Sequence, residues 1–332
     1  HGTAGITKNT SPQPHMVRNY PKAAVMKIAW FTPFSTKSAI GQTGKLICER
    51  LAEKHDVDIW THDKTSLIST NLRIRVFDTK HLDKLDLSGY DHLIYNMGNF
   101  AGNHKEIWEV MERYPGIVIP HDQLMQNFFI QAFAMKEYGG DEINGFQKYS
   151  ELMSELYGEV GKRAAAAKYP GYFNDEGPIW NSAGALEFPM VERLFKSARG
   201  LFIHSGSFAE SAREKFNGPI QWSYLPLPLP NAIEHPPENL PAIDLSQKFL
   251  LVATGIVHPV KNIKLITDLL ARDPELREKI AFVVIGEYGG SYGNELKSLG
   301  DDELKGNLYL LGFQPQEVMD WYLSKADACV NL

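Results

Sequence analysis

The feature that most constrains this chain is an alternation of strand-like and helix-like segments that runs twice. Short apolar runs alternate with longer amphipathic segments over residues 25–121, and the pattern restarts at residue 249. Between the two halves, residues 226–241 contain six prolines. Proline fixes φ and removes a backbone donor, so this stretch is expected to be a linker. Strands that alternate with helices are typical of parallel, doubly wound sheets, and the sequence therefore predicts two Rossmann-like α/β domains that face a cleft.

The predicted elements follow this pattern. Strands are expected at residues 25–31, 57–60, 72–77, 92–95, 116–120, 200–204, 249–253, 281–285, 308–311 and 328–332. Helices are expected at residues 45–54, 104–114, 207–216, 262–271, 294–299 and 316–324. The long segment 122–199, rich in Met, Tyr, Phe and Ala, is expected to form two or three helices packed on the first domain.

The predicted domain boundaries follow from these elements. Residues 1–25 are interpreted as a tag remnant or a disordered arm, and residues 26–225 as the N-terminal domain with its insert. Residues 226–247 are the linker, and residues 248–332 are a C-terminal domain. Because the chain ends on a strand, this second domain is expected to be short of strands.

The composition argues against several classes of protein. The 332 residues are 43% hydrophobic and 22% charged, which supports buried cores and argues against disorder. The net charge of -6 provides no overall field for nucleic acid. The longest apolar run, residues 249–257, is too short to span a bilayer. Cys48 and Cys329 lack metal-ligand spacing, and both are expected to be buried as small hydrophobic residues.

A loop with two glycines, Gly41 and Gly44, is expected after the first strand. Glycine allows the backbone to approach a phosphate closely. However, the spacing is not G-x-G-x-x-G, and residues 60–62 place no carboxylate at the end of the second strand, where a dinucleotide ribose would be bound. The sequence therefore argues against a nicotinamide site, and a tight strand-to-helix turn is as good an interpretation as a ligand loop.

Residues 254–262 follow the first strand of the second half and lead into a helix. Lys261 lies close to the N-terminus of that helix. Backbone N–H groups at a helix N-terminus, together with a full positive charge, suit a diphosphate. A solvated lysine in a first helical turn is the alternative interpretation, and the pattern alone leaves both open.

His121 and Asp122 directly follow the strand expected at residues 116–120. Doubly wound folds bind their ligands outside the carboxyl ends of the strands. A single histidine is more often a structural group than a catalyst, but this position next to a carboxylate makes the two interpretations equally good.

Together these segments resemble the family-four retaining glycosyltransferases of the GT-B fold, in the branch that acts on bacterial surface polysaccharides. The similarity extends over nearly all of residues 26–332, apart from the helical insert and the linker. The most specific match is the pair of segments 95–104 and 114–122, which resembles the family's run ending in His-Asp. The other matching segments are residues 26–44, 202–208, 255–261 and 312–322.

The resemblance implies a role for each matching residue. On the donor side, Lys261 would pair with the diphosphate. His121 would contact the transferred sugar and shape the reaction centre, with Asp122 as the second catalytic residue. The other residues implied in donor binding are Gly41, Gly44, Ser205, Gly255, Gly312 and Phe313. Asn99 and His104 would lie on the acceptor side.

The resemblance also implies the chemistry. A sugar would pass from a nucleotide-sugar donor to a glycan or lipid-linked acceptor with retention of configuration, without a metal ion or a cofactor, since the nucleotide sugar is a substrate. The leaving phosphate would take the proton of the acceptor hydroxyl, so no protein nucleophile is needed. The implied enzyme is cytoplasmic with no nucleic-acid partner, and a peripheral association with the inner face of the membrane stays open.

The sequence departs from the family pattern at two places. Ile256 stands where the family usually has an arginine that helps to bind the diphosphate. The paired glutamates that contact sugar and ribose, and the terminal helix that crosses back to the first domain, would follow Leu332. The second domain is therefore expected to be incomplete in this chain.

Two alternative functions follow from these departures. The first is a non-catalytic protein that binds a glycan or a nucleotide sugar, which the missing glutamates favour. His121 and Lys261 favour an active parent instead. The second alternative is a GT-B sugar-nucleotide 2-epimerase, which shares the architecture but not the run ending in His121 and Asp122.

Overall fold

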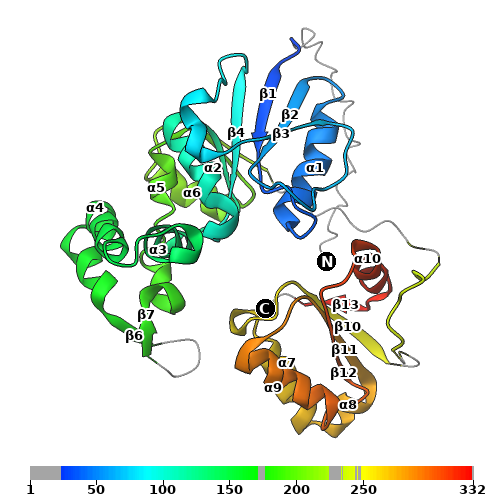
Figure 1. Ribbon diagram of the computed structural model, residues 1–332. Coiled ribbons are helices and arrows are strands. Elements are labelled where there is room, and N and C mark those ends of the chain that lie inside the picture. The colour runs from blue at the N-terminus through cyan, green and yellow to red at the C-terminus, as the bar shows by residue number, and fades with distance from the viewer. Residues whose placement is uncertain are drawn as a thin grey trace, which may run out of the picture.

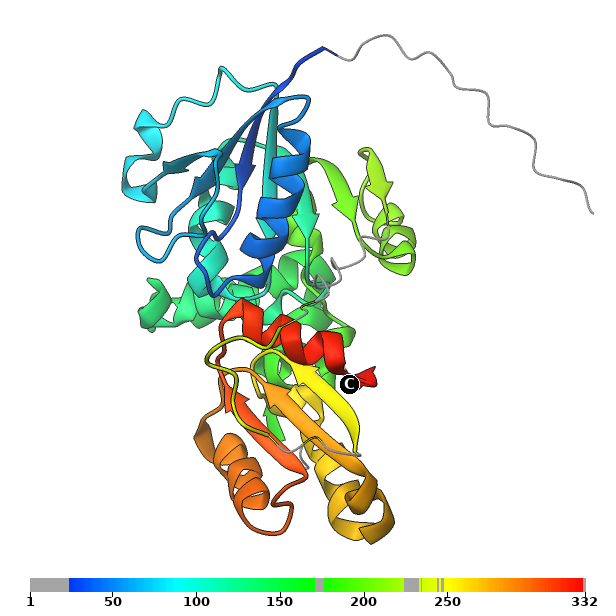
Figure 2. The ribbon, with the colours of Figure 1, turned by 90° about the vertical axis from the view of Figure 1, so that its right-hand side faces the viewer.

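The computed structural model describes residues 24–170, 176–223, 233, 235–243, 245 and 248–330. Within them the chain forms two separate parallel sheets, one above the other in Figure 1 and again in the perpendicular view of Figure 2. The first sheet has seven strands in the order β3-β2-β1-β4-β5-β8-β9, and the second has four in the order β12-β11-β10-β13. This arrangement confirms the predicted fold class of two Rossmann-like α/β domains.

The central strands of the first sheet are buried on both faces, as expected for parallel strands joined by helical crossovers, whereas the edge strands are partly exposed. Its strands are β1 (Lys27–Phe31), β2 (Asp56–Thr61), β3 (Arg73–Val76), β4 (His92–Met97), β5 (Gly116–Pro120), β8 (Ala198–Ile203) and β9 (Ile220–Trp222). Alternate residues of each strand point to opposite faces. In β1, Phe31 packs into the core shared with α2 (Ala101–Arg113), whereas Trp30 packs into the core under α1 (Ala39–Leu51).

Helix α1 begins six residues earlier than predicted. The hydroxyl oxygen of Ser38 accepts a hydrogen bond from the backbone N–H of Gly41, and this N-cap starts the helix at Ala39. Gly41 and Gly44 therefore lie in the first two turns of α1 and not in a loop, and that part of the prediction is wrong.

The segment between β5 and β8 packs on the first domain, as predicted. It contains α3 (Gln126–Ala134), α4 (Gly145–Ala166) and the short α5 (Glu192–Phe195), and residues of all three helices belong to the same core as α2. Helix α4 is interrupted at Gly158, whose φ is 66°. The segment also carries an antiparallel pair that was not predicted, β6 (Lys168–Pro170) and β7 (Glu176–Pro178). Helix α6 (Gly206–Arg213) follows β8.

The second sheet consists of β10 (Phe249–Thr254), β11 (Ile280–Ile285), β12 (Leu308–Gly312) and β13 (Ala328–Cys329). Its helices are α7 (Ile263–Arg272), α8 (Pro274–Lys279), α9 (Gly290–Asp301) and α10 (Gln316–Lys325). Residues of α7 and α9 pack on one face and residues of α10 on the other. Cys48 is buried as predicted, but Cys329 is exposed, so that prediction is wrong for the second cysteine.

Part of the proline-rich segment lies outside the described residues. Its described end, around residues 235–245, forms no helix or strand, and its apolar side chains at Leu240, Ile243 and Leu245 pack against the second core. The hydroxyl of Tyr322 in α10 donates to the carbonyl of Pro241 at 2.9 Å. The end of the predicted linker is therefore attached to the second domain.

Both sheets reverse their strand order at their first strand, between β1 and β4 and between β10 and β13. Such switch points open a crevice at the carboxyl ends of the strands. We call the ends of β1, β4 and β5 the first carboxyl edge, and the ends of β10, β11 and β12 the second carboxyl edge. Among the described residues, no helix is long and apolar enough to cross a membrane.

Candidate functional site

His121 lies at the first carboxyl edge, directly after β5. Its backbone N–H donates to the carbonyl of Met97 at 2.8 Å, and its Nε2 lies 2.9 Å from Oδ1 of Asn96. The amide of Asn96 donates to the carbonyl of Phe31 at 3.1 Å, which turns Oδ1 toward the histidine. Because Oδ1 can only accept, Nε2 carries the proton, and Nδ1 is the ring nitrogen that can accept a hydrogen bond from a ligand hydroxyl.

The imidazole of His121 is neutral near pH 7. Burial lowers its pKa to about 4, and the nearby ring of His204, with its centroid 5.4 Å away, adds to the effect. A neutral imidazole with a fixed tautomer presents a defined acceptor at this edge without a charge.

Asp122, the next residue, connects two loops and interacts electrostatically with the second domain. Its Oδ2 accepts a hydrogen bond from the backbone N–H of Asn99 at 2.9 Å, which joins the ends of β4 and β5. Burial raises the pKa of this carboxyl, while the Asn99 hydrogen bond and the positive charge of Lys261 lower it in part. Lys261 belongs to the second domain, so the two carboxyl edges interact electrostatically.

His104 lies beneath this edge, in the first turn of α2. Its ring is 2% exposed, and its Nδ1 donates to the carbonyl of Asn96 at 3.0 Å. Burial lowers its pKa to about 3. A Cβ at Gly98 would come within 2.7 Å of Nε2, so the glycine leaves the space that the ring fills. The described contacts of His104 are thus internal and hold Asn96 in place; contact with an acceptor stays a prediction.

Gly41, Gly44 and Ser205 have local explanations in the structure. A Cβ at Gly41 would lie 2.4 Å from the carbonyl oxygen of Pro33, and one at Gly44 would lie 3.2 Å from Nε1 of Trp30, so both glycines let α1 pack closely. The hydroxyl of Ser205 caps α6 by accepting from the N–H of Phe208 at 3.4 Å. Their roles toward a donor stay predictions.

The second carboxyl edge consists mainly of backbone. Gly255 and Gly312 have φ values of 104° and 70°, which side chains disfavour. The N–H of Gly255 donates to Ile285 and that of Gly286 to Gly312, both at 2.9 Å. A Cβ at Gly286 would come within 1.8 Å of the carbonyl oxygen of Gly255. The loops can therefore approach each other closely because glycine stands at these positions.

Lys261 stands in a short 3-10 turn (Pro259–Lys261) that leads into α7. It is half-buried and lines a small cavity together with residues 253–257. Ile256, in the same loop, is 67% exposed. The predicted position of Lys261 before a helix is confirmed, and its charge acts on the carboxyl of Asp122.

A contact between the domains that the sequence analysis missed is made by Lys37, in the loop between β1 and α1. Its Nζ lies 2.8 Å from Oε1 of Glu287, in the loop after β11, and 5.4 Å from the ring centroid of Phe313, after β12. The carbonyl of Glu287 also accepts from the N–H of Val257 at 2.8 Å. Lys37 is the single cation in residues 32–38, which is the only sequence signal that could have suggested it.

The architecture matches solved glycosyltransferase structures. HepE from Anabaena in complex with UDP and glucose is 13% identical, with 92% of this chain and 74% of that chain covered and a TM-score of 0.51. The catalytic domain of starch synthase IV from Arabidopsis thaliana bound to ADP and acarbose is 11% identical, with 92% and 78% covered and a TM-score of 0.53. The chain has the GT-B fold. No protein-family model matches it, and no curated protein matches its sequence significantly.

In a GT-B fold the two Rossmann-like domains present the carboxyl ends of their strands to each other. Here those edges hold His121 and Asp122 on one side and Lys261 on the other, with Lys37 reaching across. The arrangement offers a neutral acceptor nitrogen, a half-buried carboxylate and two ammonium groups. Such a set can bind an anionic ligand and position a polar group beside it.

Proposed function

We propose that the protein is a glycosyltransferase that moves a sugar from a nucleotide-sugar donor to a glycan or lipid-linked acceptor with retention of configuration. The observation that carries the proposal is that the positive charge of Lys261, in the second domain, acts on the buried carboxyl of Asp122 and lowers its pKa in part. The similar GT-B structures support it, since one is a complex with UDP and glucose and the other holds ADP and acarbose.

The second carboxyl edge would bind the donor. Lys261 would pair with the diphosphate, while the tight glycine loops at Gly255 and Gly312 let backbone groups approach it. The ring of Phe313, 52% exposed, would line the base pocket. A charge-assisted hydrogen bond to the diphosphate contributes about 1.5–3 kcal/mol.

The first carboxyl edge would bind the transferred sugar. Nδ1 of His121 would accept a hydrogen bond from a sugar hydroxyl, and Asp122 would hold the loop through Asn99. In the reaction, the bond between the anomeric carbon and the leaving phosphate oxygen breaks. The acceptor oxygen bonds to the same face of that carbon, and its proton passes to the phosphate. Lys261 would stabilise the negative charge that develops on the leaving group.

The remaining roles are proposals of the same kind. The helical insert and the loop at Asn99 lie on the first domain, where the acceptor would bind. We place the enzyme in the cytoplasm, with a peripheral association at the membrane when the acceptor is lipid-linked. Neither a metal ion nor a cofactor enters the proposed reaction.

The test is calorimetric titration with a panel of nucleotide sugars, followed by product analysis with simple sugar acceptors. NMR of the anomeric proton reports retention or inversion. Donor binding with a new glycosidic product supports the proposal. Binding without turnover would support a binding protein, and recovery of an epimerised nucleotide sugar would support a 2-epimerase. No binding of any nucleotide sugar would refute both enzymes.

A further inference from the structure

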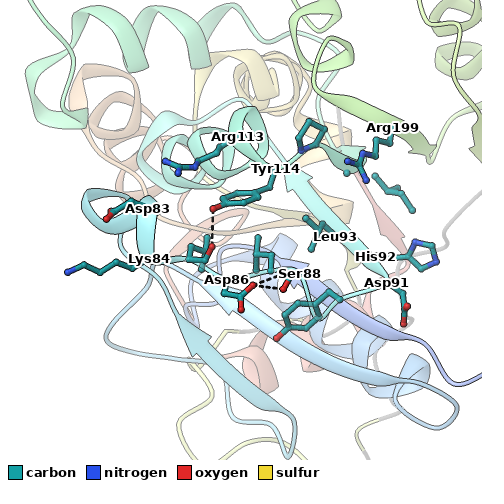
Figure 3. A pocket seen from close by; sticks show the side chains of 16 residues that line it. Asp83, Lys84, Asp86, Ser88, Asp91, His92, Leu93, Arg113, Tyr114 and Arg199 are labelled. Atoms are coloured by element: carbon teal, nitrogen blue, oxygen red, sulfur yellow. Dashed lines mark hydrogen bonds between the residues drawn. The ribbon is translucent and has the colours of Figure 1, made fainter.

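A cavity of 610 Å³ lies at the opposite end of the first sheet, around the amino ends of β4, β5 and β8 (Figure 3). Its walls come from residues 83–93, from residues 113–117 after α2 and from Arg199 at the start of β8. β5 runs from this cavity to His121, and five residues of strand span roughly 16 Å. The cavity is therefore separate from the candidate functional site, and its volume is in the range of small-ligand sites.

The cavity is lined by equal numbers of positively and negatively charged side chains. Three are cationic, Lys84, Arg113 and Arg199, and three are carboxylates, Asp83, Asp86 and Asp91. Such a lining favours neither a polyanion nor a polycation, because each like-charge contact offsets an attractive one. The planar guanidinium groups donate hydrogen bonds and the planar carboxylates accept them, which suits the neighbouring hydroxyl groups of a sugar.

The carboxylates accept hydrogen bonds from their own chain, and the guanidinium of Arg113 lies over the ring of Tyr114, 5.7 Å from its centroid. Asp86 accepts from the N–H and hydroxyl of Ser88, and Asp91 accepts from the N–H of Lys27 at 2.7 Å. Over the described ranges, neither Arg113 nor Arg199 forms an ion pair. Their N–H groups are thus available to a bound ligand.

The floor of the cavity is apolar and rigid. Leu93 and Ile117 come from neighbouring strands, and the ring of Tyr114 is fixed by a hydrogen bond from its hydroxyl to the carbonyl of Leu85 at 2.9 Å. Arg199 also lines the cavity, and its charge partly opposes the rise that burial causes in the pKa of the adjacent Tyr95. A sugar ring has an apolar C–H face that packs on such a surface.

We propose that this cavity is a second glycan-binding site, for an uncharged oligosaccharide. The arginines and free carboxylate oxygens would bind its hydroxyl groups, and Tyr114 with Leu93 would pack against its ring faces. The site adds to the proposed transfer reaction and does not depend on it. A chain held there would stay near the protein between binding events at the candidate functional site, because tethering raises the effective concentration.

The test is a calorimetric titration of the full chain with three neutral hexasaccharides. These are the α-1,4-, β-1,4- and β-1,3-linked glucose oligomers. At least one is expected to bind. The double variant Arg113→Ala/Arg199→Ala is expected to weaken that binding by tenfold or more. Arg213→Ala is the matched control, since it removes an exposed arginine from the last turn of α6, as Arg113 stands in the last turn of α2.

Thermal midpoints and UDP titrations of each variant complete the test. Unchanged midpoints and unchanged UDP affinity in the double variant support a separate site. The proposal is overturned if no hexasaccharide binds, if Arg213→Ala weakens binding equally, or if inorganic pyrophosphate displaces the oligosaccharide. Loss of oligosaccharide binding in Lys261→Ala would also overturn it. Hexasaccharide binding without sugar transfer would refute the proposed function alone, and transfer without such binding would refute this site alone.

Discussion

The two carboxyl edges are built in opposite ways. At the first edge, side chains are held by hydrogen bonds: His121 to the side chain of Asn96, Asp122 to the backbone N–H of Asn99, and the buried His104 to the carbonyl of Asn96. At the second edge the loops are glycine backbone, and the larger side chains of Ile256 and Phe313 are more than half exposed. The first edge is organised before any ligand binds, whereas the second is shaped to let a ligand approach its backbone.

Because of this difference, we expect the first edge to contribute mainly to turnover and the second edge mainly to donor affinity. Interactions that are fixed in advance stabilise a transition state without reorganisation, so they act on turnover. Interactions with the diphosphate stabilise the bound ground state as well as the transition state, so they raise the affinity for the donor. The following variants test whether turnover and affinity separate between the edges in this way.

The largest expected effect is on turnover in His121→Ala. Losing one positioned polar group lowers turnover by roughly 10²–10³, by analogy with oxyanion-hole donors, while donor affinity changes little. Turnover per folded molecule and the melting temperature are measured together. His204→Ala serves as a control, because it removes a neighbouring ring that does not bond to Asn96. A destabilised but fully active His121→Ala would show that the residue is structural.

Lys261→Ala is expected to act on affinity. Removing a charged donor weakens UDP binding by about 1.5–3 kcal/mol and leaves uridine binding nearly unchanged. Calorimetry with both ligands measures the difference. Lys264→Ala is the matched control, since Lys264 pairs with Asp268 and Glu295 within the second domain. Equal losses for UDP and uridine would exclude Lys261 from the diphosphate site.

Acid is expected to destabilise the first domain through two histidines whose pKa values burial lowers, His104 and His121. His104 has a folded pKa of about 3, well below the unfolded value near 6.5. Between these values the unfolded chain binds a proton that the folded domain does not, so stability falls as the pH is lowered below 6.5. Each histidine contributes a slope of about 1.4 kcal/mol per pH unit.

Denaturant unfolding at a series of pH values measures that slope. His104→Asn retains a donor toward the carbonyl of Asn96 and removes one titration, so it should reduce the slope by about 1.4 kcal/mol per pH unit and leave the contribution of His121. An unchanged slope in the variant would mean that another group is responsible.

The smallest expected effect belongs to Lys37→Met. The ion pair with Glu287 is 66% and 54% exposed, and such pairs contribute about 0–1 kcal/mol. UDP affinity should change by less than about fivefold, and more at low salt than at high salt. Lys64→Met removes a similarly exposed pair with Asp78 inside the first domain and should leave affinity unchanged. A tenfold loss would place Lys37 in the donor site itself.

The sequence predicted most of the strands and the positions of the main site residues. Parallel strands are nearly continuous apolar runs, so β1, β5 and β11 could be recognised directly. The residue after a strand in such a sheet is also fixed in space, which is why His121 and its neighbour were found at the predicted edge.

The errors have physical reasons. Glycines inside a helix look like a loop unless the cap is recognised, and Ser38 was the overlooked signal at α1. The pair β6 and β7 is short and follows a long helix, so its pattern was hidden. The contact between Lys37 and Glu287 joins residues 250 positions apart, and no local pattern reveals such a contact.

The attachment of Leu240, Ile243 and Leu245 to the second core has a practical consequence for dissecting the molecule. A second domain that began at Lys248, directly before β10, would lack three apolar side chains of its core. It would also lack the carbonyl that accepts the hydrogen bond of the Tyr322 hydroxyl. The face under α10 would then be exposed to water. A second domain that is to be produced on its own should therefore begin before Leu240.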